Sequence, residues 1–171
     1  MNEIQSIASL NKLYSNGVKI MRITQYTDYG LRTLIYLGAH PGDIIPMPQI
    51  AAHYAISPNH LMKVTQQLTK LGYVESVRGR NGGLRLTRAP KEINIGTVVR
   101  QMEPLDIVEC FSPNGQCLIA PVCRLKEVLG RAMRAFHQEL AKHSLEDLLD
   151  NREQLVELLH PSTPSVETTS I

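Results

Sequence analysis

Tryptophan is absent from this 171-residue sequence, and phenylalanine occurs only twice. A membrane span of about 20 apolar residues is also lacking, because the longest mostly apolar stretch covers residues 34–39. No basic segment followed by an apolar one opens the chain, which argues against a secretory signal. Hydrophobic residues make up 43% and charged residues 20% of the sequence, which excludes wholesale disorder and collagen-like repeats. We therefore expect a globular protein of the cytoplasm that does not enter a membrane.

Patterns typical of enzymes are missing as well. There is no serine–histidine–aspartate arrangement with a nucleophile elbow, no P-loop and no HExxH motif. The glycines of residues 79–83 do not match the dinucleotide fingerprint, because they lie in a basic segment that no predicted helix follows. The sequence therefore predicts a binding protein and not an enzyme.

Cysteine is scarce, and its three copies are an odd number that cannot form a closed set of disulfides. Without an export signal, we expect all three to be thiols in a reducing compartment. They lie close together, at Cys110, Cys117 and Cys123. Thiolates are ligands of iron–sulfur clusters and of zinc. The gaps of six and five residues are wider than the gap of about two to four that zinc ligand pairs usually have, so a larger cluster fits better.

Three thiolates leave one ligand position to be filled from elsewhere. The candidates are a small molecule or one of four side chains: Asp28, Glu109, His137 and His143. The alternative is that the three cysteines are free thiols in an apolar core. Proline, glycine, asparagine and glutamine between them argue against a packed core and favour a loop that folds around a metal centre.

Charge is nearly balanced overall, at a formal net +2, but it is unevenly distributed. Residues 21–100 hold ten Lys and Arg against four Asp and Glu, a net charge of +6. Residues 101–171 hold six against eleven, a net charge of −5. A basic half joined to an acidic half indicates a module that binds a polyanion, with a separate function behind it. Two ordinary solvated surfaces would explain the charges equally well.

A helix-turn-helix is predicted over about residues 48–71. Ser57 followed by Pro58 is a strong helix start, because serine caps the first turn and proline suits the first helical position. Gly72 supplies the stop. Between them, apolar residues recur at spacings of three and four and form the buried face, which consists of Leu61, Val64, Leu68 and Leu71.

The start of this second helix is the expected DNA-reading element. A helix in the major groove meets base edges with exposed polar side chains near its N-terminus, and Asn59, His60 and Lys63 occupy those positions. Ser57 and the free N–H groups of the first turn can bind a backbone phosphate. We therefore assign these four residues to DNA binding.

A β-hairpin is predicted over about residues 73–87, as the wing of a winged helix. Two β-favouring segments, 73–77 and 84–87, flank a glycine-rich loop with an Asn81-Gly82 turn signal. Arg78, Arg80 and Asn81 lie at its tip, a shape that can enter a DNA groove or lie on the backbone. The competing interpretation is a helical hairpin that packs on another domain, with merely solvated arginines.

The predicted fold is mainly α with this small hairpin: a winged helix-turn-helix at residues 21–103, a cysteine loop at 104–123 and helices at 124–159. An apolar stripe at helical spacing runs from Leu125 to Leu140. Ser144, with Asp147 three residues on, predicts a capping box and a second helix start. Residues 1–20 are either a flexible arm or an extension before a natural start at Met21, and residues 160–171 are expected to be a disordered tail.

Residues 21–150 resemble a bacterial family of iron–sulfur winged-helix transcriptional regulators, which includes IscR, RirA and NsrR. The opening MRITQYTDYGLR of residues 21–32 is similar to the family N-terminus and supports Met21 as the natural start. The segments ISPNHL (56–61) and VRGRNGGL (77–84) are similar to the recognition helix and wing of the family. The cysteine segments VECF and CLIAPVC and the RLK that follows are most similar to the nitric-oxide-sensing branch, that of NsrR.

The resemblance also implies a ligand set. IscR-type members place a ligand histidine three residues after the third cysteine, where this chain has Lys126. In NsrR-type members an aspartate near the N-terminus of the other subunit completes the site, and Asp28 falls at the matching position. The expected ligands of a 4Fe–4S or 2Fe–2S cluster are therefore Cys110, Cys117 and Cys123, with Asp28 of the partner subunit.

The function implied by the resemblance is repression of nitrosative-stress genes. The long helix after Arg124 would pair with its twin in a homodimer, so that two wings face a palindromic double-stranded operator. Nitric oxide would be the signal that alters the cluster and moves the reading heads. Three alternatives stay open: a regulator that senses iron or redox status, a zinc-stabilised DNA-binding protein, and a cluster carrier whose basic half binds something else.

Overall fold

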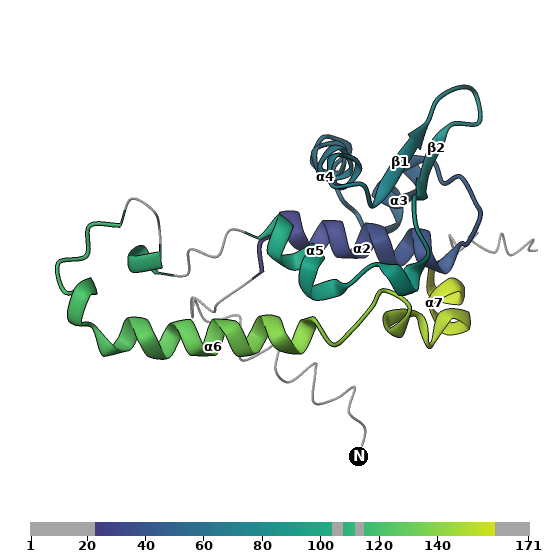
Figure 1. Cartoon of the computed structure of the whole chain (residues 1–171). Helices are drawn as coiled ribbons and strands as arrows, with labels where there is room; N and C mark the ends of the chain where they lie inside the picture. Colours follow the sequence, from purple (N-terminus) through teal and green to yellow (C-terminus); the bar gives the residue numbers. More distant parts are fainter. Residues whose placement is uncertain (1–22, 104–107, 112–114, 160–171) are drawn as a thin grey trace, which may run out of the picture.

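The computed structural model describes residues 23–103, 108–111 and 115–159. The expectations for residues 1–20 and 160–171 lie outside these ranges. In chain order the main elements are α2 (Gln25–Ala39), α3 (Met47–His53), α4 (Pro58–Lys70), β1 (Val74–Val77), β2 (Gly83–Leu86), α5 (Ile95–Met102), α6 (Arg124–Leu140) and α7 (Arg152–Leu159). The predicted class, mainly helical with one hairpin, is confirmed (Figure 1). No helix in the described ranges is long and apolar enough to cross a membrane.

The helix-turn-helix consists of α3 and α4. The Ser57 side chain accepts a hydrogen bond from the backbone N–H of His60, as an N-cap does, and Pro58 takes the first helical position. Gly72 has a φ of +74°, the left-handed conformation that ends a helix at little cost for glycine. Leu61, Val64 and Leu68 are fully buried, so the predicted inner face is correct.

The wing is an antiparallel hairpin whose strands pair from Val74 opposite Leu86 to Val77 opposite Gly83. Its second strand is also fastened to the body, because Ile45 and Leu84 exchange two backbone hydrogen bonds of 2.9 and 2.8 Å. A Cβ atom at Gly83 would lie 2.4 Å from the carbonyl oxygen of Ile45. Only glycine permits this approach, so the second strand is held against Ile45 close to the hairpin loop.

The C-terminal helix α7 packs on α2. Leu159 is buried, and the Tyr36 hydroxyl donates to its carbonyl at 3.5 Å. The Arg152 guanidinium donates to the Gly38 carbonyl at 2.9 Å. Helix α7 therefore has a packing partner within its own chain, and the dimerisation role expected for residues 124–159 stays a prediction.

The capping box after α6 forms as predicted, although the helix it begins is short. The backbone N–H of Ser144 donates to the Asp147 carboxylate at 2.7 Å, and the N–H of Asp147 donates back to the Ser144 hydroxyl at 3.3 Å. The backbone N–H and the hydroxyl of Ser144 both donate to the carboxylate, and these two hydrogen bonds lower the pKa of Asp147. The element is a single 3-10 turn, Asp147–Leu149, and regular helix resumes only at Arg152.

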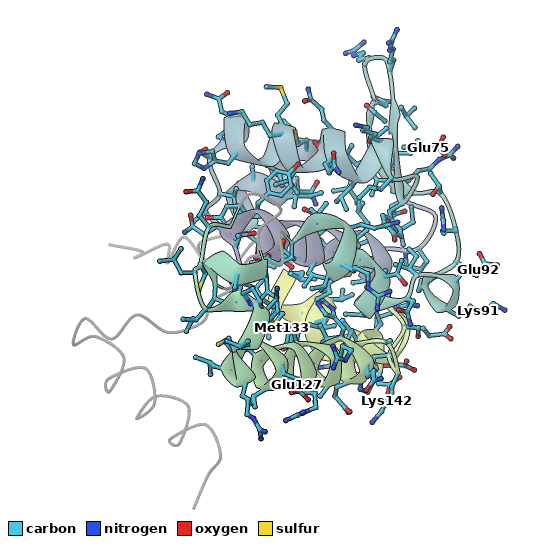
Figure 2. The ribbon with its side chains drawn as sticks, turned by 60° about the vertical axis from the view of Figure 1, so that its left-hand side comes forward. Glu75, Lys91, Glu92, Glu127, Met133 and Lys142 are labelled. Carbon is cyan, nitrogen blue, oxygen red and sulfur yellow. The ribbon has the colours of Figure 1, made fainter. Side chains whose placement is uncertain are left out.

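Helix α6 joins the body at its C-terminal end and extends away from it at the other (Figure 1). The Asn94 side chain donates to the Ala141 carbonyl at 2.7 Å, and Gly96 packs against the backbone of Ala141. His137 is the one buried residue of α6. Glu127 and Met133 mark this helix in Figure 2, and Lys142 lies just beyond its end, all on the opposite side of the molecule from the hairpin that carries Glu75.

Candidate nucleic-acid interface and metal centre

The residues predicted to bind DNA gather on one side of the molecule. Helix α4 and the hairpin lie side by side there, opposite α6, in both views (Figures 1 and 2). All seven predicted residues are exposed: Ser57, Asn59, His60, Lys63, Arg78, Arg80 and Asn81. The structure therefore brings the helix start and the hairpin tip to a common face.

The hairpin tip presents uncompensated positive charge. Gly79 has a φ of +116°, and the backbone N–H of Gly82 closes the turn on the Gly79 carbonyl at 3.0 Å. Among the described residues, Arg85 at the root of the hairpin is paired with Glu75, whereas no ion pair involves Arg78 or Arg80. These two guanidinium groups are free to meet phosphate, which carries most of the affinity of DNA-binding proteins.

The exposed residues of α4 divide into two flanks. His60 and Lys63 line a hollow of about 190 Å³ against α2, which contributes Tyr26 and Tyr29. The Tyr26 hydroxyl donates to the Lys63 carbonyl at 3.1 Å, and burial raises the pKa of Tyr26. His60 thus lies toward α2 and not along the middle of the exposed face. The base-edge contacts expected of His60 and Lys63 stay a prediction.

The other flank of α4 faces the hairpin and was not assigned a role from the sequence. Met62 and Gln66 lie on it one helical turn apart, and both line a second hollow between α4 and the strands. The helical spacing alone separates exposed from buried positions. It does not say which exposed side faces the wing, because that depends on where the hairpin packs.

The three cysteines are half-buried free thiols at the outer end of α6. Cys123 immediately precedes the first residue of α6, and Phe111, the neighbour of Cys110, packs over Gly130. Ring atoms of Phe111 lie 3.8 Å from where a Cβ of Gly130 would be. This contact places the segment that carries Cys110 against α6, the helix that Cys123 directly precedes.

A hollow of about 470 Å³ lies at this point and is strongly basic. Cys123 and Phe111 line it together with three cations, Arg124, Lys126 and Arg134. Its one acid, Glu127, is already paired with Arg131 at 2.6 Å. A thiolate-ligated iron–sulfur cluster is anionic, so the Cys123 thiol and the surrounding charge fit such a group, although Cys110 and Cys117 do not line this hollow.

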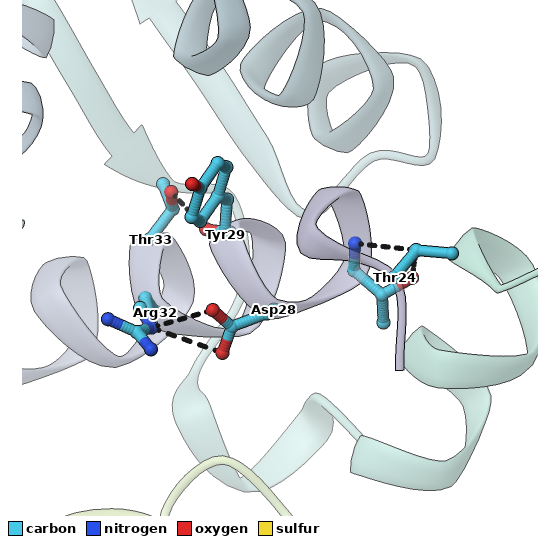
Figure 3. Close-up of polar contacts among 6 residues, drawn as sticks. Thr24, Asp28, Tyr29, Arg32 and Thr33 are labelled. Atoms are coloured by element: carbon cyan, nitrogen blue, oxygen red, sulfur yellow. Dashed lines mark hydrogen bonds and ion pairs between the residues drawn. The ribbon is translucent and has the colours of Figure 1, made fainter. Parts of the chain in front are cut away.

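The candidate fourth ligands do not join the cysteines within one chain. Asp28 pairs with Arg32 at 3.0 Å on the exposed side of α2 (Figure 3). His137 lies 14 residues after Cys123 on a continuous helix, a separation of about 21 Å that no same-chain ligation can bridge. His143 lies beyond the end of that helix. The side chain of Glu109 lies outside the described residues. In the described ranges no three His, Cys, Asp or Glu side chains gather as a metal site would require.

His137 differs from the other candidates because it is buried without hydrogen bonds. It is 6% exposed, and neither ring nitrogen has a partner among the described residues. A buried polar group in this state costs stability. Its place beside the junction of α6 with α5 removes it from the candidate metal centre.

One residue that the sequence interpretation missed connects the end of α5 to the start of α2. The Glu103 carboxylate accepts from the backbone N–H of Thr24 at 3.0 Å and from the Thr24 hydroxyl at 2.9 Å. Thr24 is the N-cap of α2, the helix that carries Asp28, and Glu103 directly follows α5. No local signal predicts a pair 79 residues apart in the chain.

Comparisons with known proteins agree with this geometry. The Rrf2 family, described as iron-dependent transcriptional regulators, matches residues 23–151. The transcriptional regulator NsrR of Bacillus subtilis is 52% identical over 142 residues, which cover 81% of this chain and 97% of that protein. NsrR of Halalkalibacterium halodurans is 51% identical over the same coverage.

Solved structures give the same result at lower identity. T. potens IscR has a TM-score of 0.63 at 26% identity and covers 81% of this chain and 91% of its own. CymR, the global cysteine regulator of B. subtilis, has a TM-score of 0.59 at 27% identity and covers 75% and 96%. These relatives are regulators, which confirms the expectation of a DNA-binding protein that is not an enzyme. The chain belongs to the Rrf2 family of winged-helix transcriptional regulators.

Proposed function

We propose that this protein is a cytoplasmic homodimeric repressor that releases operator DNA when nitric oxide reacts with an iron–sulfur cluster. The observation that carries the proposal is a basic hollow at the start of α6, lined by the free thiol of Cys123 and by Phe111, the neighbour of Cys110. That helix extends from a winged-helix domain whose reading face lies on the opposite side. The similarity to NsrR supports nitric oxide as the signal.

The surface of α6 and the loop before it supports the homodimer. Leu125 is 63% exposed and Val128 48% exposed, and three apolar residues of the preceding segment are exposed as well: Leu118, Ile119 and Val122. Contiguous exposed apolar side chains mark interaction surfaces. A second copy of α6 would cover them and would place two α4 helices on successive major grooves, about 34 Å apart.

The ligand set consists of Cys110, Cys117 and Cys123, with Asp28 of the partner subunit as the fourth donor. The cluster, when bound, supplies an iron centre that nitric oxide attacks. Lys126 and Arg134 offset the negative charge of the thiolates in the hollow. A carboxylate is a harder and weaker iron ligand than a thiolate, so Asp28 is the donor most easily displaced. The hydrogen bond between Glu103 and Thr24 ties the end of α5 to the start of α2 within each chain.

An anaerobic gel shift on promoter DNA, with and without nitric oxide, tests this function. Freshly isolated protein should be brown, should bind the fragment and should release it after nitric oxide is added. Colourless protein that contains zinc and binds DNA regardless of nitric oxide would contradict the sensing role. Brown protein that binds no DNA would point to a cluster carrier instead.

The substitution Asp28→Ala is expected to leave a cluster on the three cysteines and to blunt the release of DNA by nitric oxide. Operator affinity of the cluster-loaded variant, before and after nitric oxide, measures the effect. Arg32→Ala is the matched control, because it breaks the same exposed ion pair, worth about 0.3–0.5 kcal/mol, and keeps the carboxylate. If both variants respond like wild type, Asp28 does not couple the cluster to DNA.

A further inference from the structure

The hollow between α4 and the hairpin lies on the DNA-reading face and is lined by a half-exposed apolar side chain. Its volume is about 480 Å³. One wall comes from α3 and α4 and the other from the hairpin; the lining residues are Met47, Met62, Thr65, Gln66, Thr69, Ser76, Gly83 and Leu84. It opens between the two elements that contact DNA in a winged helix.

Met62 stands out on α4. It is 43% exposed and is the one large apolar side chain of this helix that is exposed, in a helix that the structure describes completely. The core is served by other positions, Leu61, Val64 and Leu68, which are fully buried. The remaining exposed side chains of α4 are polar or charged, apart from the capping proline. A half-exposed methionine thus leaves apolar area in water that burial against a partner would stabilise.

The major groove offers one apolar group to such a side chain, the 5-methyl group of thymine. Met62 is the fifth residue of α4, within the N-terminal half that approaches base edges. Its unbranched side chain adapts to irregular apolar surfaces. Gln66, one turn further on the same flank, carries the amide that pairs with adenine in this groove.

We propose that Met62 reads a thymine in each operator half-site by contact with its 5-methyl group. The inference rests on the DNA-binding function and assigns a base-reading role to a residue on the flank that faces the wing. The competing role for Met62 is to fill the hollow against Met47 and so stabilise the domain. The two roles differ in one respect: the DNA affinity depends on the thymine methyl group only if Met62 contacts that base.

Replacing single thymines by deoxyuridine removes that methyl group and leaves the base pair intact. The probe is a duplex that the full-length, cluster-loaded protein has enriched from random DNA, with each thymine replaced in turn. At one position per half-site, wild type should lose about fourfold in affinity, the value of one buried methyl group. Met62→Ala should lose a similar factor on the thymine duplex and show no further loss on the deoxyuridine duplex.

Two variants serve as controls. Gln66→Ala, from the same wall of the hollow, should weaken binding and keep the full difference between thymine and deoxyuridine. Arg80→Ala should weaken binding to both duplexes equally and reduce the salt slope by about one, as the loss of a phosphate contact does. The melting temperature of each variant separates loss of binding from loss of folding.

The proposal is overturned if wild type binds the thymine and deoxyuridine duplexes equally at every position, or if Met62→Ala keeps the difference. Either result would leave Met62 as a packing residue and the DNA-binding function intact. Failure of the wild-type protein to enrich any sequence would instead count against the operator-binding function itself.

Discussion

Replacing any one of Cys110, Cys117 and Cys123 by alanine is expected to abolish the cluster and to leave the fold of the winged helix intact. The three free thiols lie within 14 residues of the chain, just before α6, and we expect them to act as one ligand set. None belongs to the hydrophobic core, which consists of residues from α2 to α5 and the segment 145–159. Loss of one thiolate removes a strong ligand without opening a cavity in that core.

Iron and sulfide content of anaerobically purified variants, with their visible absorption, measures the first part of this expectation. Circular dichroism and the melting temperature of the cluster-free proteins measure the second. Ser76→Ala, a substitution of an exposed hairpin residue distant from α6, is the control for loss of the cluster during purification. Full occupancy in one of the three variants would remove that cysteine from the ligand set.

The substitution Gly96→Ala is expected to lower stability by about 2 kcal/mol. The new Cβ would lie 2.7 Å from the backbone nitrogen and 2.8 Å from the Cα of Ala141, and backbone atoms cannot move aside as a side-chain end can. For a chain of this size the melting temperature should fall by about 4–8 °C. The same contact fixes the angle of α6, so operator affinity of the cluster-loaded variant should fall as well.

Gly130→Ala is the matched control, since it makes the same change in the other helix of this pair. There the nearest atoms to the new Cβ are the end of the Arg134 side chain at 3.5 Å and the Phe111 ring at 3.8 Å, which are ordinary contacts. Alanine favours a helix over glycine by up to about 1 kcal/mol, so stability should be unchanged or higher. Equal melting temperatures for the two variants would show that the close approach at Gly96 does not hold α6 in place.

The helix-turn-helix was predictable because its signals are local. The Ser57 side chain caps the first turn of α4 by accepting a hydrogen bond from the backbone N–H of His60, three residues on. Gly72 ends the helix because its φ angle is positive, a conformation that glycine adopts easily. Apolar spacing of three and four places Leu61, Val64 and Leu68 on one face whatever they pack against. The hairpin followed from a turn signal between two β-favouring segments in the same way.

The candidate metal centre was predictable in composition and not in geometry. Three cysteines in a loop rich in proline and glycine indicate a soft-metal site on chemical grounds alone. Their seating on α6 depends on Phe111 meeting Gly130, and the basic hollow depends on the way Arg134 folds back toward that glycine. His137 entered the ligand candidates from its residue type alone, and the length of one straight helix removes it.

The sequence by itself determined the elements of this protein, the residue types on its reading face and the soft-donor chemistry of its loop, because each depends on residues a few positions apart. Only the tertiary structure decided that α7 covers α2, that Glu103 holds Thr24, and that Met62 faces the wing whereas His60 faces α2. These pairings join residues far apart in the chain. The spacing of apolar residues does not indicate which element packs against a given helix face. That partner is determined only when all the elements pack together.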